Sequence, residues 1–311
     1  MGGPSVNAEE SLRRESEALA RTVGHPGELF ELLQEAIQHH GYTRFSQISD
    51  DWLRLMWAID SYRIQGIPPH GMGNPRIGPA RRLGAIYRSK GNWFATLVAL
   101  LLQNQTTEVV KPRVRIEGFS QLHQVDLAWP GRHEDPLFCI ETKVTGAPAY
   151  GDVPARGPLS DWSNRRKELK FAATDLKLFR RQQETRIEHW DVWRGAAPPR
   201  TYFLWGARID GDGPDLADMT KMCSEARALV QSYLEGAGLV AWRQRSDGAG
   251  YATVATPREE RVSSLDDVLY KIASEIRASL IGGVAPAPVV PAIRAVDLGQ
   301  LLEEPEREPD A

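Results

Sequence analysis

The sequence has few of the features that mark several large classes of protein. It contains only two cysteines, Cys139 and Cys223, which excludes a disulfide framework and a cysteine-rich zinc site. The longest apolar run, residues 93–102, is half of the roughly 20 residues that a membrane-spanning helix needs. The first residues contain no apolar segment of the kind found in signal peptides. These absences predict a cytoplasmic protein.

The chain also lacks the charge excess of a general nucleic-acid-binding protein. Its formal net charge is −3 over 311 residues, so any contact with nucleic acid must come from a local basic patch. The glycine-rich segment 71–78 is not a phosphate-binding loop, because no strand precedes it and no Gly-Lys-Ser/Thr ends it. With 41% hydrophobic and 25% charged residues, the composition is that of a globular protein with one large domain or two small ones.

Hydrophobic periodicity and Gly/Pro breaks divide the chain into four parts. They are a helical N-terminal region (1–65), a basic Gly/Pro-rich linker (66–90), an α/β domain (91–281) and a disordered tail (282–311). Within the α/β domain, the first expected elements are a helix (91–105), three strands (109–118, 121–129 and 137–144), a helix (161–182) and a strand (201–209). A mixed sheet flanked by helices is therefore the expected fold.

Two of these strands place acids in an unusual position. Strands 122–129 and 137–145 are separated by a short turn and are expected to pair as an antiparallel hairpin. Folding the hairpin near residues 133 and 134 sets Asp126 opposite Glu141, with Lys143 one step along the same face. Two facing carboxylates repel by about 0.2–1 kcal/mol. A divalent cation held between them would supply the missing charge, with Lys143 beside it to orient water or steady a phosphate.

The chain resembles the PD-(D/E)XK nuclease superfamily in one motif and in its expected element order. The motif is Asp126 followed fifteen positions later by Glu141-Thr142-Lys143, and the order is α-β-β-β-α-β. The resemblance covers about residues 91 to 209, and Val125 stands where the motif usually has proline. It implies a restriction-endonuclease-like fold and a Mg²⁺-dependent DNA endonuclease of the restriction or defence type, with Mn²⁺ as a substitute. It implies that Asp126 and Glu141 are metal ligands and that Lys143 assists attack by water.

Other functions remain open at this point. The same fold without cleavage would be a nucleic-acid-binding or scaffold module, and the N-terminal 65 residues would suit a helical adaptor that coexists with either. Besides DNA, a second copy of the chain and an accessory defence protein are the partners considered. Further metal ligands are sought at Glu108 and Glu117, with Gln103, Gln105 and Gln124 as neutral substitutes.

Basic residues concentrate in two segments. Between residues 165 and 181 the expected helix has seven basic and two acidic side chains, and one flank of it carries Arg166, Lys170, Lys177 and Arg181. Residues 61–107 contain no acid at all and include Arg81 and Arg82. Both segments are predicted to contact phosphate, the alternative being an ordinary solvated helix face. Trp162, beside the proposed site, is either a core residue or a platform for a base.

Overall fold

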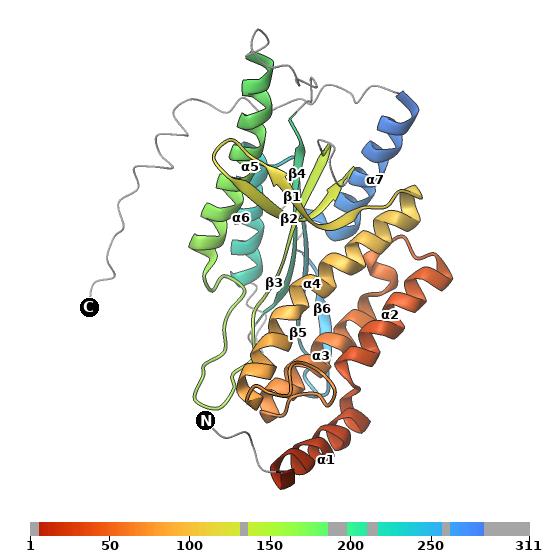
Figure 1. The fold of residues 1–311 in the computed structure, drawn as a ribbon, viewed down its shortest axis with the longest axis vertical. Coiled ribbons are helices and arrows are strands. Elements are labelled where there is room, and N and C mark those ends of the chain that lie inside the picture. The colour runs from red at the N-terminus through yellow and green to blue at the C-terminus, as the bar shows by residue number, and fades with distance from the viewer. Residues whose placement is uncertain (1–5, 131–135, 186–197, 210–216, 257–261, 283–311) are drawn as a thin grey trace, which may run out of the picture.

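The computed structural model describes residues 6–130, 136–185, 198–209, 217–256 and 262–282 (Figure 1). The helices are α1 (Val6–Val23), α2 (Pro26–His40), the short 3₁₀ helix η1 (Phe45–Gln47), α3 (Ser49–Gln65), α4 (Pro79–Thr106), α5 (Trp162–Thr185), α6 (Ala217–Ser232) and α7 (Leu265–Gly282). The strands are β1 (Lys111–Glu117), β2 (Leu122–Trp129), β3 (Phe138–Thr145), β4 (Arg200–Arg208), β5 (Gly236–Gln244), β6 (Tyr251–Val254) and β7 (Ser263–Ser264). The chain thus follows the α-β-β-β-α-β order expected after residue 91.

The strands form one mixed, open sheet in the order β1 to β6, with β7 paired to β5. Strands β1, β2 and β3 are antiparallel neighbours, whereas β3, β4 and β5 run parallel. Helix α5 connects β3 to β4, because two parallel neighbours need a crossover between them. The expected α/β class with a mixed sheet is confirmed.

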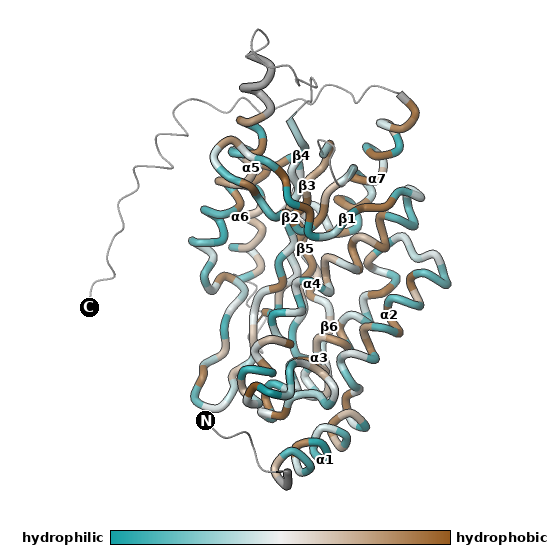
Figure 2. Tube along the Cα trace, viewed as in Figure 1, coloured by the Kyte–Doolittle hydropathy of each residue, from teal (hydrophilic) through white to brown (hydrophobic). Residues whose placement is uncertain are grey.

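Helices cover both faces of this sheet (Figure 1). The central strand β4 is buried almost throughout, and its side chains alternate between two cores. Tyr202 and Leu204 pack with α2, α3, α4 and α7, while Phe203 and Trp205 pack with α5 and α6. Figure 2 shows the hydrophobic residues concentrated on the strands and the inward helix faces, with α1 largely hydrophilic. This alternation of side chains along β4 therefore gives one layer of helices on each face of the sheet.

Helices α2 and α3 are built into the same core as the sheet, which differs from the predicted division of the chain. The core on the α4 side joins Leu33 of α2 and Trp52 of α3 to Leu204 of β4. The predicted linker 66–90 is also wrong in its second half, because α4 begins at Pro79 and continues to Thr106. Proline at the first helical turn is compatible with a helix start, and the buried Leu83 and Ile86 hold this half to the core.

Residues 283–311 of the predicted tail lie outside the described residues. Within the described ranges, no helix combines the length and the apolar character needed to cross a membrane. Cys139 and Cys223 are both buried thiols.

Candidate active site

The hairpin of β2 and β3 has the predicted register. Leu127 pairs with Ile140 and Trp129 pairs with Phe138, so one further step along the ladder sets Asp126 opposite Glu141. Cys139 belongs to the small core under α5, and Ile140 belongs to the core under α4. Because side chains alternate along β3, Glu141 and Lys143 follow Cys139 onto the α5 side.

Thr142, between the two predicted catalytic residues of β3, holds the carboxylate of Asp126. Its backbone N–H and its hydroxyl both donate to Asp126 Oδ2, at 2.8 and 3.0 Å. The paired residues of β2 and β3 end at Leu127 and Ile140, so the Asp126 side chain takes up the backbone donor that follows. The carboxylate is thereby fixed at the point where β2 parts from β3.

Glu141 lies in an environment that disfavours its charge. Burial and, after it, the Asp126 carboxylate raise the pKa of its carboxyl to about 8 against the opposing effect of Lys143. The Lys143 Nζ lies 3.9 Å from Glu141 Oε2, and the Glu141 side chain is only 22% exposed. One nearby ammonium does not offset burial together with a facing carboxylate. The pair therefore lacks positive charge.

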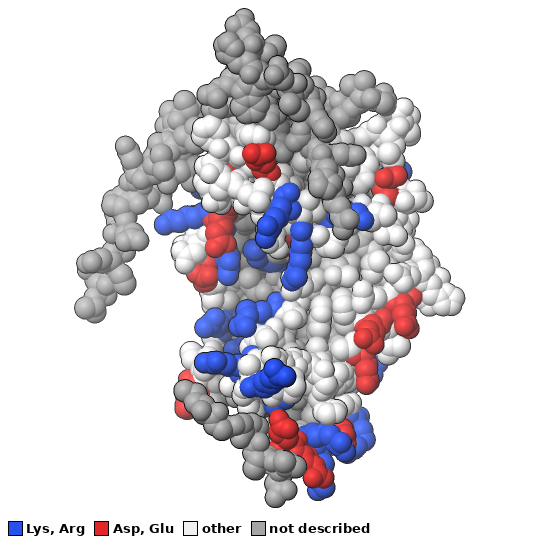
Figure 3. All heavy atoms as spheres, in the orientation of Figure 1, with Lys and Arg blue, Asp and Glu red and all other residues white. Residues whose placement is uncertain are grey.

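A cavity of about 640 Å³ opens beside these residues and is basic. Asp126, Thr142 and Lys143 form its sheet side. Its other walls include Arg88 and Asn92 of α4, Tyr87 of the same helix, Arg156 of the loop after β3, and Arg165 of α5. We call it the catalytic cavity. Basic side chains also gather across the middle of the molecular face in Figure 3, with acidic ones mainly toward its margins.

The basic flank predicted on α5 does not face this cavity. Arg166 Nη1 lies 3.4 Å from Glu225 of α6, and Lys170 lies over the ring of Tyr233. Lys177 is buried, and its ammonium donates to Tyr233 O and to Glu235 Oε1, both at 2.7 Å. Its assignment as a phosphate contact is therefore corrected.

The residue of α5 that reaches the catalytic cavity is Arg165, one position before the predicted flank. The side chain of Arg181 lies outside the described part of the structure. Helical periodicity identified a common face correctly, but this face packs toward α6 rather than toward β3.

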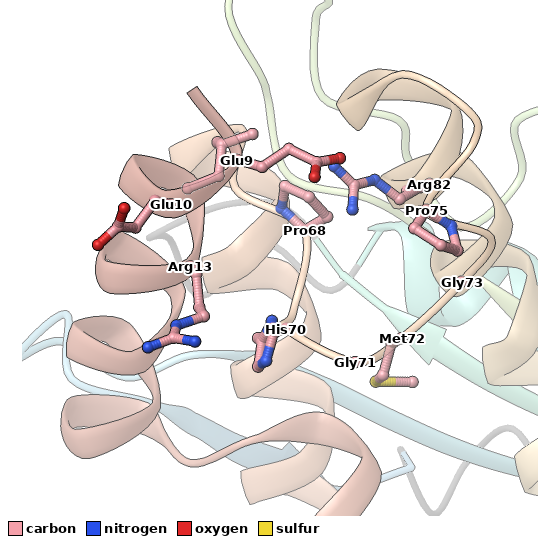
Figure 4. Close-up of a pocket in the computed structure, with 11 residues that line it drawn as sticks. Glu9, Glu10, Arg13, Pro68, His70, Gly71, Met72, Gly73, Pro75 and Arg82 are labelled. Carbon is pink, nitrogen blue, oxygen red and sulfur yellow. The ribbon is translucent and has the colours of Figure 1, made fainter. Parts of the chain in front are cut away.

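The two arginines predicted at the start of α4 lie elsewhere. Arg81 is exposed, and Arg82 lines a different cavity, of about 550 Å³, between α1 and the loop after α3. Figure 4 shows Arg82 among the residues that line this cavity, together with Glu9, Arg13 and His70. Neither arginine lines the catalytic cavity.

Two of the remaining predicted residues, Glu108 and Gln105, make structural hydrogen bonds. Glu108 Oε2 accepts a hydrogen bond from Trp129 Nε1 at 3.2 Å, and Gln105 donates to Thr43 O. Like these two, Glu117 and Gln103 are not among the residues that line the cavities on either side of Lys143. Gln124 does line the second of these cavities.

Trp162 is buried and stacks on Trp205 with ring centroids 4.3 Å apart. It is a core residue, so the alternative role as a platform for a base is wrong.

Sequence reasoning missed the contribution of Tyr87, Arg88, Asn92, Arg156 and Arg165 to the catalytic cavity. The acid-free span 61–107 was the available signal for the first three, but it did not identify which side chains face the site. Among the residues that the structure describes, no group of three or more His, Cys, Asp or Glu side chains could hold a metal ion.

Comparison of the chain with family models, with curated proteins and with solved structures found no significant match.

Proposed function

We propose that the chain is a metal-dependent nuclease of the PD-(D/E)XK type that hydrolyses phosphodiester bonds of DNA, in a restriction or defence setting. The α-β-β-β-α-β order and the mixed sheet support this proposal. The observation that carries it is the carboxylate pair of Asp126 and Glu141 beside Lys143. Asp126 and Lys143 line the cavity that also holds Arg88, Arg156 and Arg165, and Glu141 lines a smaller cavity on the other side of Lys143.

The two carboxylates suit Mg²⁺ as a cofactor. This ion is commonly bound by one or two protein carboxylates, and water and substrate phosphate oxygens fill its other positions. A pair of carboxylates without a third acidic ligand is therefore sufficient. The raised pKa of Glu141 follows from its burial and from the same Asp126 carboxylate, and a bound cation would favour the charged form. When bound, Mg²⁺ would polarise the phosphate and lower the pKa of a coordinated water.

Each remaining side chain has a task that follows from its place. The Lys143 ammonium borders both the carboxylate pair and the cavity, so it can orient a water and stabilise negative charge on the phosphate. Arg88 and Arg156 offer planar donors that match phosphate oxygens. Arg165 offers the same donors when a phosphate replaces its ion pairs with Asp161 and Glu168. Thr142 keeps Asp126 in position.

Plasmid nicking tests the activity. With Mg²⁺ or Mn²⁺ the wild type should nick supercoiled DNA, and EDTA should stop it. Asp126→Asn and Lys143→Ala should each lower the rate by on the order of 10³-fold. Glu108→Gln is the matched control, because it neutralises a carboxylate outside the catalytic cavity while its side-chain oxygen can still accept from Trp129. Absence of nicking by the wild type with either metal would favour a binding module instead.

Binding separates the two sides of α5. Arg165→Ala should weaken affinity for DNA and reduce the slope of log affinity against log salt concentration by about 1. Arg166→Ala, on the flank that faces α6, should leave that slope unchanged. Equal slopes for the two variants would remove Arg165 from the proposed phosphate path.

A further inference from the structure

A second cavity, of about 240 Å³, lies on the other side of Lys143. It is bounded by the start of β2, by β3 and by α5, and we call it the side cavity. Glu141 and Lys143 form part of its wall, so the side cavity directly adjoins the proposed catalytic residues. Its volume is below the roughly 300–1,000 Å³ of cavities that take drug-sized molecules, which suits an occupant the size of one heteroaromatic ring system.

The charges of the side cavity disfavour a phosphate. Lys143 is opposed there by Glu141 and by Glu168 of α5, in contrast to the catalytic cavity with its three arginines. The other polar side chains are the imidazole of His123, which is bonded to Asp175, and the neutral amides of Gln121 and Gln124. Neither amide has a hydrogen-bond partner within the described part of the chain. The expected occupant is therefore uncharged and carries hydrogen-bond donors and acceptors on its edge.

The apolar wall of the side cavity contains an exposed aromatic ring. Phe171 is 43% exposed, and its ring lies 5.5 Å from that of His123. His123 is buried and its Nε2 is bonded to Asp175 Oδ2 at 2.7 Å, so the neighbour of the exposed Phe171 ring is held in place. Leu169 and Ala172 complete an apolar surface. An occupant with a flat apolar face matches this wall.

We infer that the side cavity binds a nucleobase of the strand whose phosphate lies at Lys143, an inference that rests on the proposed nuclease function. A base has a planar π face for Phe171 and a neutral polar edge for the two glutamines. A base that is still paired carries its complement on that edge and cannot enter a cavity of this size. The substrate is therefore a nucleic acid with an unpaired or flipped nucleotide next to the scissile phosphate.

Two substitutions of exposed phenylalanines provide a matched test. Phe171→Ala removes the proposed stacking surface, whereas Phe119→Ala removes an equally exposed ring, 49% exposed, that does not line the side cavity. Both are made in a background with Asp126→Asn, and their affinities for fluorescent single-stranded oligonucleotides and for a blunt duplex are measured by anisotropy. Phe171→Ala should weaken single-strand binding about 5- to 150-fold. Phe119→Ala should not change it, and Phe171→Trp should restore it.

An abasic nucleotide locates the contact. Oligonucleotides with one abasic position, moved along the strand, should show one position at which affinity for the Phe171-containing protein falls. Phe171→Ala should be insensitive to that same position, because the partner of the missing base is already gone. Two results would overturn the inference that the side cavity binds a base. One is an equal loss of affinity at every abasic position in the Phe171-containing protein and in Phe171→Ala. The other is an equal affinity of Phe171→Ala and Phe119→Ala for single strands.

The outcome also separates this inference from the proposed function. If the wild type nicks DNA with Mg²⁺ but Phe171→Ala binds and nicks like the wild type, the side cavity is excluded and the nuclease stands. If the wild type neither nicks nor binds any oligonucleotide, both proposals fail. If it binds without nicking, the Phe171 series still decides the side cavity by affinity alone.

Discussion

Acidic side chains are removed from solvent at two neighbouring places in the molecule, and the charges that surround them differ. Asp60 of α3 is fully buried, and its carboxylate meets the Lys90 ammonium at 3.4 Å and the Tyr251 hydroxyl at 2.5 Å. Glu141 instead faces the carboxylate of Asp126, with the Lys143 ammonium 3.9 Å away. The first site contains its own counter-charge. The second has no such counter-charge, and this difference is the basis for the cation site proposed there.

Tyr87 lies between these two places. Its ring has the Lys90 Nζ 3.7 Å and the Arg63 Cζ 4.1 Å from its centroid, and its hydroxyl donates to Gly146 O at 2.8 Å. Gly146 follows β3 directly with φ of +80°, and a Cβ there would lie 2.3 Å from Arg208 O, so only glycine fits. The structural pair therefore supports the end of the strand that carries Lys143.

The largest effect on stability is expected at the structural pair. Lys90→Met leaves the Asp60 carboxylate buried without its cation, which should lower the free energy of unfolding by about 3–5 kcal/mol. The double variant with Asp60→Asn should recover much of this loss, because no uncompensated charge remains. Urea denaturation measures it, with exposed Lys167→Met as the control expected within about 0.5 kcal/mol of wild type. A small loss for Lys90→Met would show that the two places do not differ as described.

At the proposed metal site, removal of a charged group should have the opposite effect on the stability of the metal-free protein. Mn²⁺ at about 100 times its dissociation constant should stabilise the wild type by roughly 2.7 kcal/mol. Asp126→Asn should lose most of that gain. Above about pH 8, where both carboxyl groups are charged, it should be at least as stable as the wild type in EDTA, because it relieves the repulsion with Glu141. Thermal melts with and without a bound oligonucleotide measure both effects. A wild type insensitive to Mn²⁺ in both conditions would contradict a metal site between these carboxylates.

A third expected effect is a pH dependence in the metal-free protein, spread over several pH units. The folded state raises the pKa of Glu141 to about 8 from an ordinary value near 4.5, so it holds a proton that the unfolded chain releases. Between these two values the free energy of unfolding should therefore fall as pH rises, by at most about 1.4 kcal/mol per pH unit from this group. Metal binding displaces the same proton, so affinity for Mn²⁺ should rise toward pH 8.

Glu141→Gln is the variant that isolates this group. It should flatten the fall in stability over that pH range, and urea denaturation at several pH values measures it. An unchanged pH profile would assign the dependence to other groups.

Local sequence was sufficient to predict the order of elements and the facing pair of acids. Strand alternation and a short connection between two strands determine which residues of a hairpin face one another, and for that reason Asp126 and Glu141 are opposite as expected. The predicted helix starting at residue 91 shows the limit of this approach. Gly/Pro content suggested a linker before it, but Leu83, Ile86 and Lys90 are buried by distant partners, and helix α4 begins at Pro79.

Only the tertiary structure decided which basic residues border the catalytic cavity. Periodicity shows which side chains of a helix share a face, but the packing of that face depends on elements far along the chain. Lys177 is buried because Tyr233 and Glu235, 56 and 58 residues later, supply its acceptors. Arg88, Arg156 and Arg165 converge because α4, the loop after β3 and α5 meet around one strand. Neither relation is local, so no pattern in the sequence contains it.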